Sequence, residues 1–441
     1  MTTTPVRPTT SAAEDCGCPD FSRAGMSRRS LLKSSAVLGG GMAMTQMFGE
    51  AMMQASFGGT TGGNTMVVIS LRGGIDGMGM VVPYGDPGYY TARPHTAVPA
   101  SSLICKDSMF GLHPKMAPLQ KYWSSGELAA VQAVGLPVAN RSHFSAIEAV
   151  EDAAPGSSLR SGWINRMVGV ANTSGSHSDP QCLDAVQLGM NFPTTALGGD
   201  APTLAATDLS GLQISGLDAD YVTQRYSSLA TAWAGATGPL ANGNSEAVAI
   251  SKGPGKNLKA MADNPNVTYP TVWNAAPFAA PLKSAAKLIR ANLGTDVIAI
   301  DAGNWDLHTN YGNLTGGTMQ SNIDGLAQAL AAFLDDLSTA RQRVTVVTLT
   351  EFGRRVAENG SQGFDHGWGT MMLLAGAGVR GGRYYGTWPG LDGASVADGD
   401  LKVTTDYRTV LTEVVQRRFS DRSTAQMFPG FTGYSPLGFM A

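Results

Sequence analysis

Residues 297–308 read VIAIDAGNWDLH, and residues 344–366 read VTVVTLTEFGRRVAENGSQGFDH. In each stretch an apolar run rich in valine or isoleucine ends in a cluster of acidic residues and histidine. Such runs are typical of buried strands in an open α/β sheet, where ligands bind beyond the carboxyl ends of the strands. We therefore predict a reactive site at these strand ends. Four side chains there are candidate metal ligands: Asp306, His308, Glu351 and His366.

The rest of the chain repeats this alternation of strand and helix. Further short apolar runs indicate strands at residues 66–71, 128–134, 183–188 and 371–374. Helical patterns occupy residues 142–152, 277–293, 319–341 and 406–419. The alternation predicts an α/β fold in three layers, with a mostly parallel sheet and helices on both faces. Residues 191–274 are rich in Gly, Ala, Ser, Thr and Asn, and we expect an inserted cap region there.

Composition excludes several classes of protein. Of 441 residues, 43% are hydrophobic and 15% are charged, which favours a large buried core over disorder. The net charge of −3 provides no basic footprint for nucleic acid. After the amino-terminal segment there is no apolar run of about 18 residues, so we expect no transmembrane span in the mature protein.

The amino-terminal segment has the features of an export signal. Residues 27–33, SRRSLLK, form a twin-arginine pattern, and a weakly apolar segment rich in Gly, Ala and Met follows. We predict that residues 1–57 are a signal and that residues 58–441 form the exported domain, which is periplasmic, envelope-associated or extracellular. This route carries folded proteins, often already loaded with metal. Cys105 and Cys182 remain after signal removal, and whether they pair stays open.

Glycine-bounded turns carry two more acidic candidates. Asp76 follows the first strand in the turn RGGIDG, where glycine allows a ligand or ion to approach the backbone closely. The alternative is that Asp76 only stabilises the turn. Asp365 and His366 lie in GFDHGWG, and histidine is the commonest metal ligand, although a loop histidine without such a role is the alternative.

The other candidate ligands also have plainer interpretations. Asp306 and His308 are two residues apart, so their side chains can share one face of an extended backbone. They could equally be a hydrogen-bonded pair. Glu351 ends an apolar strand, and a buried charge there needs a partner, which could be the nearby Arg354.

Candidate catalytic residues lie at the start of the helix predicted at residues 142–152. Ser142 and His143 open this helix, where free N–H groups and the helix dipole favour an anion. Ser142 is a candidate nucleophile, or only the helix cap. Arg141 is a candidate clamp for an oxyanion. His113 and Arg72 are secondary candidates.

Taken together, these motifs resemble a known family. The twin-arginine signal and the segments LRGGIDGM, NRSHF, NWDLHTN, TEFGR and FDHGWG identify the chain as a member of the exported proteins called domain of unknown function 1501. The resemblance covers residues 66–419. That family in turn resembles a divergent branch of the alkaline phosphatase and sulfatase superfamily, which implies an alkaline phosphatase-like fold and a metal-dependent ester hydrolase.

The resemblance also implies roles for single residues. Asp76 matches the first aspartate of the superfamily, Ser142 falls near the nucleophile, and His366 matches the final histidine. The segment TEFG, residues 350–353, replaces an Asp-His pair, so a second metal would lose a nitrogen ligand. The sulfatase signature is absent, which disfavours a formylglycine enzyme.

Two ligand sets follow from this resemblance. Asp306, His308 and His366 would suit Zn or Mn. Asp76, Glu351 and Ser142 offer only oxygens and would suit Ca, Mg or Mn. One ion, two ions, or loss of catalysis all remain open.

We thus predict an exported, metal-dependent hydrolase of phosphate or sulfate esters. The metal would polarise the ester, Ser142 or a water would attack, and Arg141 with the helix start would stabilise negative charge. The inserted region would select a small-molecule or glycan ester. One alternative is a non-catalytic binding or assembly protein on the same fold, with an exported protein partner. Another is a phosphomutase-like or carbohydrate-processing enzyme.

Overall fold

The computed structural model describes residues 51–52, 63–170, 182–212, 221–237 and 247–441. The predicted twin-arginine signal lies outside the described residues, except for residues 51–52 near its end. Within the described part of the chain, no helix combines the length and the apolar character that crossing a membrane requires.

Ten strands of the described residues form one sheet in the order β1-β7-β6-β8-β2-β9-β10-β5-β11, with β14 beside β5. The central strands are β6 (Ala185–Leu188), β8 (Val297–Ala302), β2 (Thr65–Leu71), β9 (Val344–Leu349), β10 (Thr370–Gly376) and β5 (Leu128–Gly135). The outer strands are β1 (Ala51–Met52), β7 (Leu204–Ala206), β11 (Tyr384–Tyr385) and β14 (Thr405–Asp406). The predicted mostly parallel sheet is confirmed, although β10 runs antiparallel to both β9 and β5.

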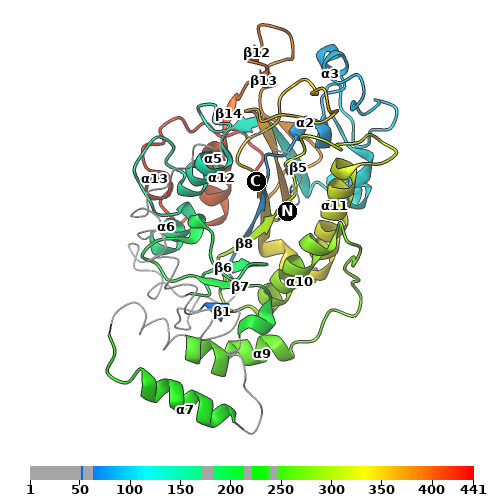
Figure 1. The fold of residues 1–441 in the computed structure, drawn as a ribbon. Coiled ribbons are helices and arrows are strands. Elements are labelled where there is room, and N and C mark those ends of the chain that lie inside the picture. Colours follow the sequence, from blue (N-terminus) through cyan, green and yellow to red (C-terminus); the bar gives the residue numbers. More distant parts are fainter. Residues whose placement is uncertain (1–50, 53–62, 171–181, 213–220, 238–246) are drawn as a thin grey trace, which may run out of the picture. The chain divides into compact units, whose positions relative to one another are not determined.

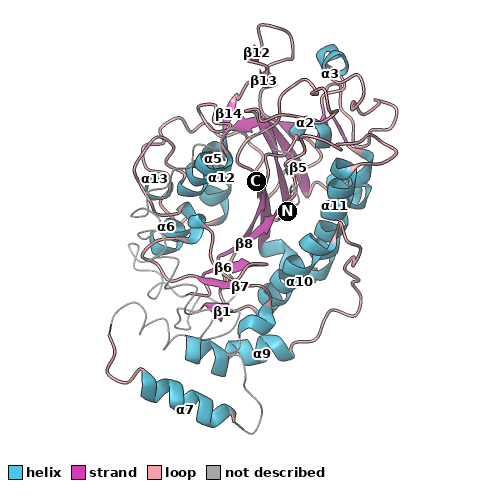
Figure 2. Cartoon of the chain, viewed as in Figure 1, coloured by secondary structure: helices cyan, strands magenta, loops and turns pink. Residues whose placement is uncertain are grey.

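The sheet is buried on both faces, as its continuous apolar strands predict. In β2, Val67 and Ile69 point to one hydrophobic core, whereas Met66 and Val68 point to the other, because successive side chains of a strand alternate between faces. Helices α10 (Ala276–Ala291) and α11 (Thr318–Asp336) cover the first face. Helices α5 (His143–Asp152), α6 (Trp163–Val170), α12 (Tyr407–Arg418) and α13 (Thr424–Met427) cover the second. Figures 1 and 2 show these two helical layers on either side of the strands, so the predicted three-layer α/β fold is confirmed.

The long helices follow from their sequence patterns. In α11 the buried residues Ile323, Leu326, Leu330 and Phe333 recur every three or four positions, so they form one apolar stripe. Helix α10 has a proline in its first turn and ends at Asn292, whose φ of 53° lies in the left-handed region. The apolar stripe therefore gives α11 a face to bury, and the end signals set the bounds of α10.

Most of the remaining described elements are short. They are α2 (Gly77–Met80), α3 (Pro87–Ala92), η1 (Pro114–Leu119), α4 (Gln120–Ser124), η3 (Thr195–Leu197), η4 (Leu209–Leu212), α7 (Val222–Ala232), α9 (Pro254–Ala260) and η5 (Ser338–Arg343), with the small strand pairs β3 (Val81–Val82) to β4 (Gly111–Leu112) and β12 (Val396–Ala397) to β13 (Asp400–Leu401). Within residues 191–274, where the sequence predicts an inserted cap, β7 pairs with β6 and so joins the main sheet.

One edge of the sheet collects the loops that carry the candidate residues. The loops after β2, β8, β9 and β5 all leave at this edge, because these four strands run parallel to one another. His366 precedes its strand instead of following it. It reaches the same edge because β10 runs the opposite way, so the beginning of β10 lies beside the ends of its neighbours. The topology therefore brings these loops together at the place where α/β sheets bind ligands.

Candidate metal centre

Three imidazole rings and one carboxylate converge at this edge. Nε2 of His366 lies 3.0 Å from Nε2 of His143 and 3.0 Å from Nε2 of His308. Oδ1 of Asp306 lies 3.0 Å from Nε2 of His308 and 3.4 Å from Nε2 of His366. Oδ2 of Asp306 lies 3.4 Å from Nε2 of His143. Four potential donor groups therefore face one another, and the carboxylate of Asp306 is 41% exposed to solvent.

The other nitrogen of each ring is held by an acceptor. Nδ1 of His143 lies 2.9 Å from Oε1 of Glu351, and Nδ1 of His308 lies 2.9 Å from Oδ1 of Asp365. Nδ1 of His366 lies 2.8 Å from the backbone oxygen of Arg141. Since a carboxylate or carbonyl can only accept, each Nδ1 carries the proton in the neutral ring, and each Nε2 presents a lone pair to the centre. This orientation is typical of histidines that bind a metal.

The spacing of the donors fits a metal ion. Donors around a tetrahedral zinc ion, with bonds of about 2.0–2.1 Å, stand roughly 3.3–3.4 Å apart. Among the described residues, donor atoms of His143, Asp306 and His366 all lie within 4.8 Å of one another. His308 falls outside that group, yet its Nε2 is 3.0 Å from donors of both Asp306 and His366, so we include it as a fourth candidate ligand. Nitrogen and oxygen donors of this kind suit Zn or Mn.

Packing keeps the rings in place. Phe352 is almost fully buried, and its ring centroid lies 4.8 Å from those of both His143 and His366. Phe352 thus packs against two of the imidazole rings. Gly73 has a φ of 117°, and a Cβ there would lie 2.5 Å from the backbone nitrogen of Asp306. Glycine at this position lets the loop that carries Asp306 approach the turn after β2.

A buried arginine adjoins the cluster. Nη2 of Arg354 lies 2.6 Å from Oδ1 of Asp306, and the Arg354 side chain is 1% exposed. The same guanidinium donates to the backbone oxygens of Gly73, Gly74 and Phe364. Arg354 therefore fixes Asp306 relative to the turn after β2. The sequence-based alternative, in which Arg354 is the partner of Glu351, is not the contact that the structure contains.

The electrostatics of the cluster favour positive charge. Burial would raise the pKa of Asp306, but hydrogen bonds from His143, His308, His366 and Arg354 hold it well below its usual range. Burial would likewise lower the pKa of His143, but hydrogen bonds to Asp306 and Glu351 outweigh it and raise the pKa to about 9. Without a metal, the cluster therefore retains a proton at neutral pH.

Asp76 does not join the cluster. Both oxygens of its carboxylate accept hydrogen bonds from Arg93, at 2.6 and 2.9 Å, and the hydroxyl of Tyr311 donates to Oδ2 at 2.5 Å. Arg93 and Asp76 are 0% and 3% exposed. Glu351, the second acidic member of the all-oxygen set, accepts from Gly73 N at 2.8 Å and from Thr350 as well as contacting His143. Asp76 and Glu351 therefore have other partners in the structure and do not come together as the second ligand set that the resemblance implied.

The candidate catalytic residues have differing surroundings. Ser142 occupies the position before α5, but its side chain makes no capping hydrogen bond. The guanidinium of Arg141 is held by Asp400 at 2.6 Å and by Asp398 at 2.9 Å. An oxyanion would have to compete with these carboxylates for it. His143, which the sequence suggests as a catalytic residue, instead faces the other donors.

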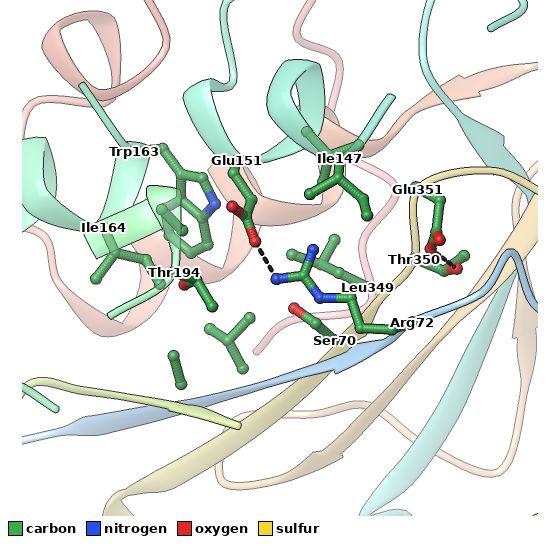
Figure 3. Close-up of a pocket in the computed structure, with 14 residues that line it drawn as sticks. Ser70, Arg72, Ile147, Glu151, Trp163, Ile164, Thr194, Leu349, Thr350 and Glu351 are labelled. Atoms are coloured by element: carbon green, nitrogen blue, oxygen red, sulfur yellow. Dashed lines mark hydrogen bonds and ion pairs between the residues drawn. The ribbon is translucent and has the colours of Figure 1, made fainter. Parts of the chain in front are cut away.

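The secondary candidates, His113 and Arg72, have structural contacts and are not members of the cluster. His113 is buried and accepts from Lys115 N at the start of η1, and burial lowers its pKa to about 4. Arg72 lies between Asp301 and Glu151, donating to Asp301 at 2.9 Å. It borders a small cavity of about 20 Å³ lined by residues of α5, α6, β2 and β9 together with Glu351 (Figure 3). That space holds about one water molecule. No disulfide joins Cys105 and Cys182.

Sequence reasoning missed two features of this centre. It placed His143 among the catalytic groups and not among the metal ligands. The proximity of His143 to His366 depends on pairing between strands that are far apart in the chain, so no local pattern could indicate it. It also did not foresee that Asp365 and Glu351 hold the Nδ1 atoms of His308 and His143 and do not themselves face the centre. A carboxylate beside a histidine in sequence, as in FDH, was the available signal, but the partner of Asp365 is His308 and not its neighbour.

Comparisons with known proteins agree with the motifs. A family model described as "Protein of unknown function (DUF1501)" matches residues 109–421, a range that includes the four clustered residues but not Asp76. No curated protein matches the chain.

Several solved structures show a distant likeness. The C-terminal periplasmic domain of EcEptC from Escherichia coli, in complex with Zn, is 10% identical with a TM-score of 0.34, over 74% of this chain and 76% of that one. A protein in the alkaline phosphatase superfamily from Vibrio parahaemolyticus is 10% identical with a TM-score of 0.32, over 78% and 69%. PsFucS1 sulfatase from Pseudoalteromonas sp. is 10% identical with a TM-score of 0.33, over 93% and 76%. These values are low, so the interpretation of the site rests on its own side chains.

Proposed function

The chain belongs to the DUF1501 family of proteins of unknown function, and we propose that this member is a metal-dependent hydrolase of phosphate or sulfate esters. The observation that carries the proposal is the convergence of three Nε2 atoms and the Asp306 carboxylate, with every Nδ1 fixed by an acceptor. Three lone pairs directed at one point repel one another unless a cation or a proton lies between them.

In this proposal His143, His308, His366 and Asp306 hold the ion. A bound divalent ion would supply Lewis acidity, which polarises the ester and offsets the negative charge that develops during hydrolysis. Glu351 and Asp365 keep the rings oriented and make them more basic. Arg354 holds Asp306 and places a fixed positive charge beside the centre, which favours a substrate that carries negative charge.

Ser142 is the proposed nucleophile. It directly precedes His143, a proposed ligand, in the sequence, and its hydroxyl makes no capping hydrogen bond. The first N–H groups of α5 favour negative charge at this place. Arg141 contributes its backbone oxygen, which orients His366, and its side chain anchors that oxygen through Asp400.

One ion is the expected stoichiometry. The second set of ligands would need the carboxylates of Asp76 and Glu351. The first is held by Arg93, and the second supports His143. Arg93 therefore supplies the positive charge that a second ion would otherwise bring to Asp76.

A non-catalytic binding or assembly protein is the second candidate function. It is favoured by one observation: no hydrogen bond joins the side chain of Ser142 to a base among the described residues. A protein of this kind would keep the metal as a structural element.

Ester turnover separates the two candidates. The metal-loaded protein would be assayed with p-nitrophenyl phosphate and p-nitrophenyl sulfate, beside Ser142→Ala and Asp306→Asn. The hydrolase predicts turnover that both substitutions abolish, with metal retained in Ser142→Ala. Tight metal binding without turnover of any ester, including a wider panel of phosphate and sulfate esters, would favour the binding protein.

We also propose that the twin-arginine pattern directs export. It lies at residues 27–33, outside the described residues, so its support is the sequence alone. Replacing Arg28 and Arg29 together by lysine should leave the protein in the cytoplasm, as measured by fractionation. Unchanged export would contradict this part of the proposal.

A further inference from the structure

A second cavity lies on the other helical layer, away from the residues of the metal centre. It has a volume of about 380 Å³ and lies between α10 and residues 263–271, the loop that precedes this helix. In Figure 2 this loop leaves α9 and runs beside α10 and α11. Such a volume is within the range of sites for small ligands.

The cavity exists because its floor is made of small side chains. Ala276, Ala279 and Ala280 of α10 line it, and they leave space that longer side chains would fill. The loop contains a local turn, in which Asn266 N donates to Oδ1 of Asn264 at 3.1 Å. Residues of both α10 and the preceding loop therefore shape the cavity.

The charged groups of the cavity are paired with one another. The carboxylate of Asp263 lies 2.5 Å from the ammonium groups of both Lys283 and Lys287. The carboxylate of Asp336, at the other end, accepts from Tyr269 at 3.0 Å and from Arg290 at 2.7 Å. Since each carboxylate already has a cationic partner, a cationic ligand would gain little here. The pairs instead present fixed donors and acceptors, which suit a neutral ligand with several hydroxyl groups.

Aromatic surface lies at the same place. Tyr269 lines the cavity, and the side chain of Trp273, two residues after the lining residue Thr271, is 72% exposed. Single exposed apolar side chains are common on protein surfaces, so the relevance of Trp273 rests on its position two residues beyond the lining of the cavity. Indole and phenol rings offer apolar faces against which the C–H face of a sugar ring can pack, while their polar edges remain available for hydrogen bonds.

From these features we infer that the cavity binds a neutral saccharide. One sugar unit fits between the alanine floor and Tyr269, with its hydroxyls on Asp263 and Lys283, and the next unit packs on Trp273. This site stands whether or not the metal centre hydrolyses esters.

The position of the cavity suggests a longer ligand. Nδ2 of Asn274, next to Trp273, donates to Ser321 O at 2.8 Å, and Nδ2 of the adjacent Asn322 donates to Asn304 O at 2.7 Å. Asn304 is two residues before Asp306. The end of the cavity near Trp273 is therefore on the same edge of the sheet as the metal centre, so a glycan held here can extend toward that centre.

Calorimetry with neutral oligosaccharides tests the inference. The full folded chain would be titrated with cellohexaose, maltohexaose and neoagarohexaose, alongside Trp273→Ala, Asp263→Ala and the control Phe192→Ala, an exposed aromatic residue outside the cavity lining. We expect at least one sugar to bind, with affinity about tenfold weaker in the first two variants and unchanged in the control. Trp273 is exposed, so its loss should not affect folding.

Two results would overturn the inference: no binding of any of these sugars, or binding that neither Trp273→Ala nor Asp263→Ala weakens. A further arm separates this site from the metal centre. His366→Ala should lose metal and keep sugar binding, whereas Trp273→Ala should keep metal and bind sugar about tenfold more weakly. Sugar binding that disappears with His366→Ala would place the saccharide at the metal centre and contradict a separate site.

Discussion

Nδ1 of His366 lies 2.8 Å from the backbone oxygen of Arg141, and this hydrogen bond joins the loop before β10 to the loop after β5. The side chain of Arg141 is held in turn by Asp400, which is fully buried, and by Asp398. Arg141 is therefore a positioning residue. Its guanidinium anchors the carbonyl that orients one ligand of the proposed metal.

Arg141→Met tests this role. The substitution leaves the buried carboxylate of Asp400 without its main partner, so the free energy of unfolding should fall by about 3 kcal/mol. Metal affinity should fall about tenfold, because His366 loses its fixed orientation. Denaturant unfolding and metal titration measure the two effects. Asp398→Asn, at an exposed position, is the control and should change neither. A variant that keeps stability and metal affinity but loses turnover would show that Arg141 clamps an oxyanion instead.

Gly73→Ala should disturb the centre through the backbone alone. A Cβ at this position would lie 2.5 Å from the backbone nitrogen of Asp306, and the φ of 117° is strained for alanine. We expect a loss of about 3 kcal/mol or more in the free energy of unfolding, together with weaker metal binding. Gly126→Ala is the matched control, since Gly126 also has a positive φ, of 78°, but nothing lies within 4 Å of the added atom. Equal losses in the two variants would mean that the contact with the Asp306 loop is unimportant.

Asp76→Asn should separate stability from metal binding. Breaking a buried ion pair costs about 3–5 kcal/mol, because Arg93 would keep its charge without a counterpart. The remaining folded protein should bind metal with unchanged stoichiometry and affinity. Denaturation curves and metal analysis of the folded fraction measure both. Fewer bound ions in the variant would restore Asp76 as a ligand.

Glu351→Gln should weaken metal binding without removing a ligand. Glutamine can still accept from Nδ1 of His143, but the negative charge that makes this ring more basic is lost. Metal affinity should fall between about 10- and 100-fold. Glu358→Gln is a matched control, because Glu358 contacts His95 in the same way at a distance from the cluster. If both variants bind metal as the wild type does, Glu351 does not support a ligand.

The regular elements could be read from the sequence with small shifts in their ends. The apolar run at residues 344–349 coincides with β9, and the helix predicted at residues 277–293 is α10 at Ala276–Ala291. These predictions succeed because period and apolar character are local properties. The position of Asp306 and His308 at the same edge of the sheet as Glu351 was also expected, since ends of parallel strands meet there, whereas the grouping of His366 with them came from the family resemblance.

Other features depend on contacts that no local pattern encodes. The partner of Asp76 is Arg93, and nothing in either segment indicates that the two carboxylate oxygens are already taken. His366 precedes β10, and it meets residues that follow other strands because β10 runs antiparallel to β9. His143 joins the cluster only because the loop after β5 lies beside β10. These contacts join residues that are far apart in the chain, so they can be established only from the three-dimensional structure.

The central claim, a metal ion held by three histidines and Asp306, is tested most directly by metal analysis of the purified, folded protein. Wild type would be compared with His366→Ala and Asp306→Asn, and with His95→Ala, a histidine outside the cluster, as the control. We predict about one equivalent of Zn or Mn in the wild type and in the control, and almost none in the two cluster variants. A wild type that binds no divalent ion after reconstitution, or cluster variants that retain a full equivalent, would contradict the claim.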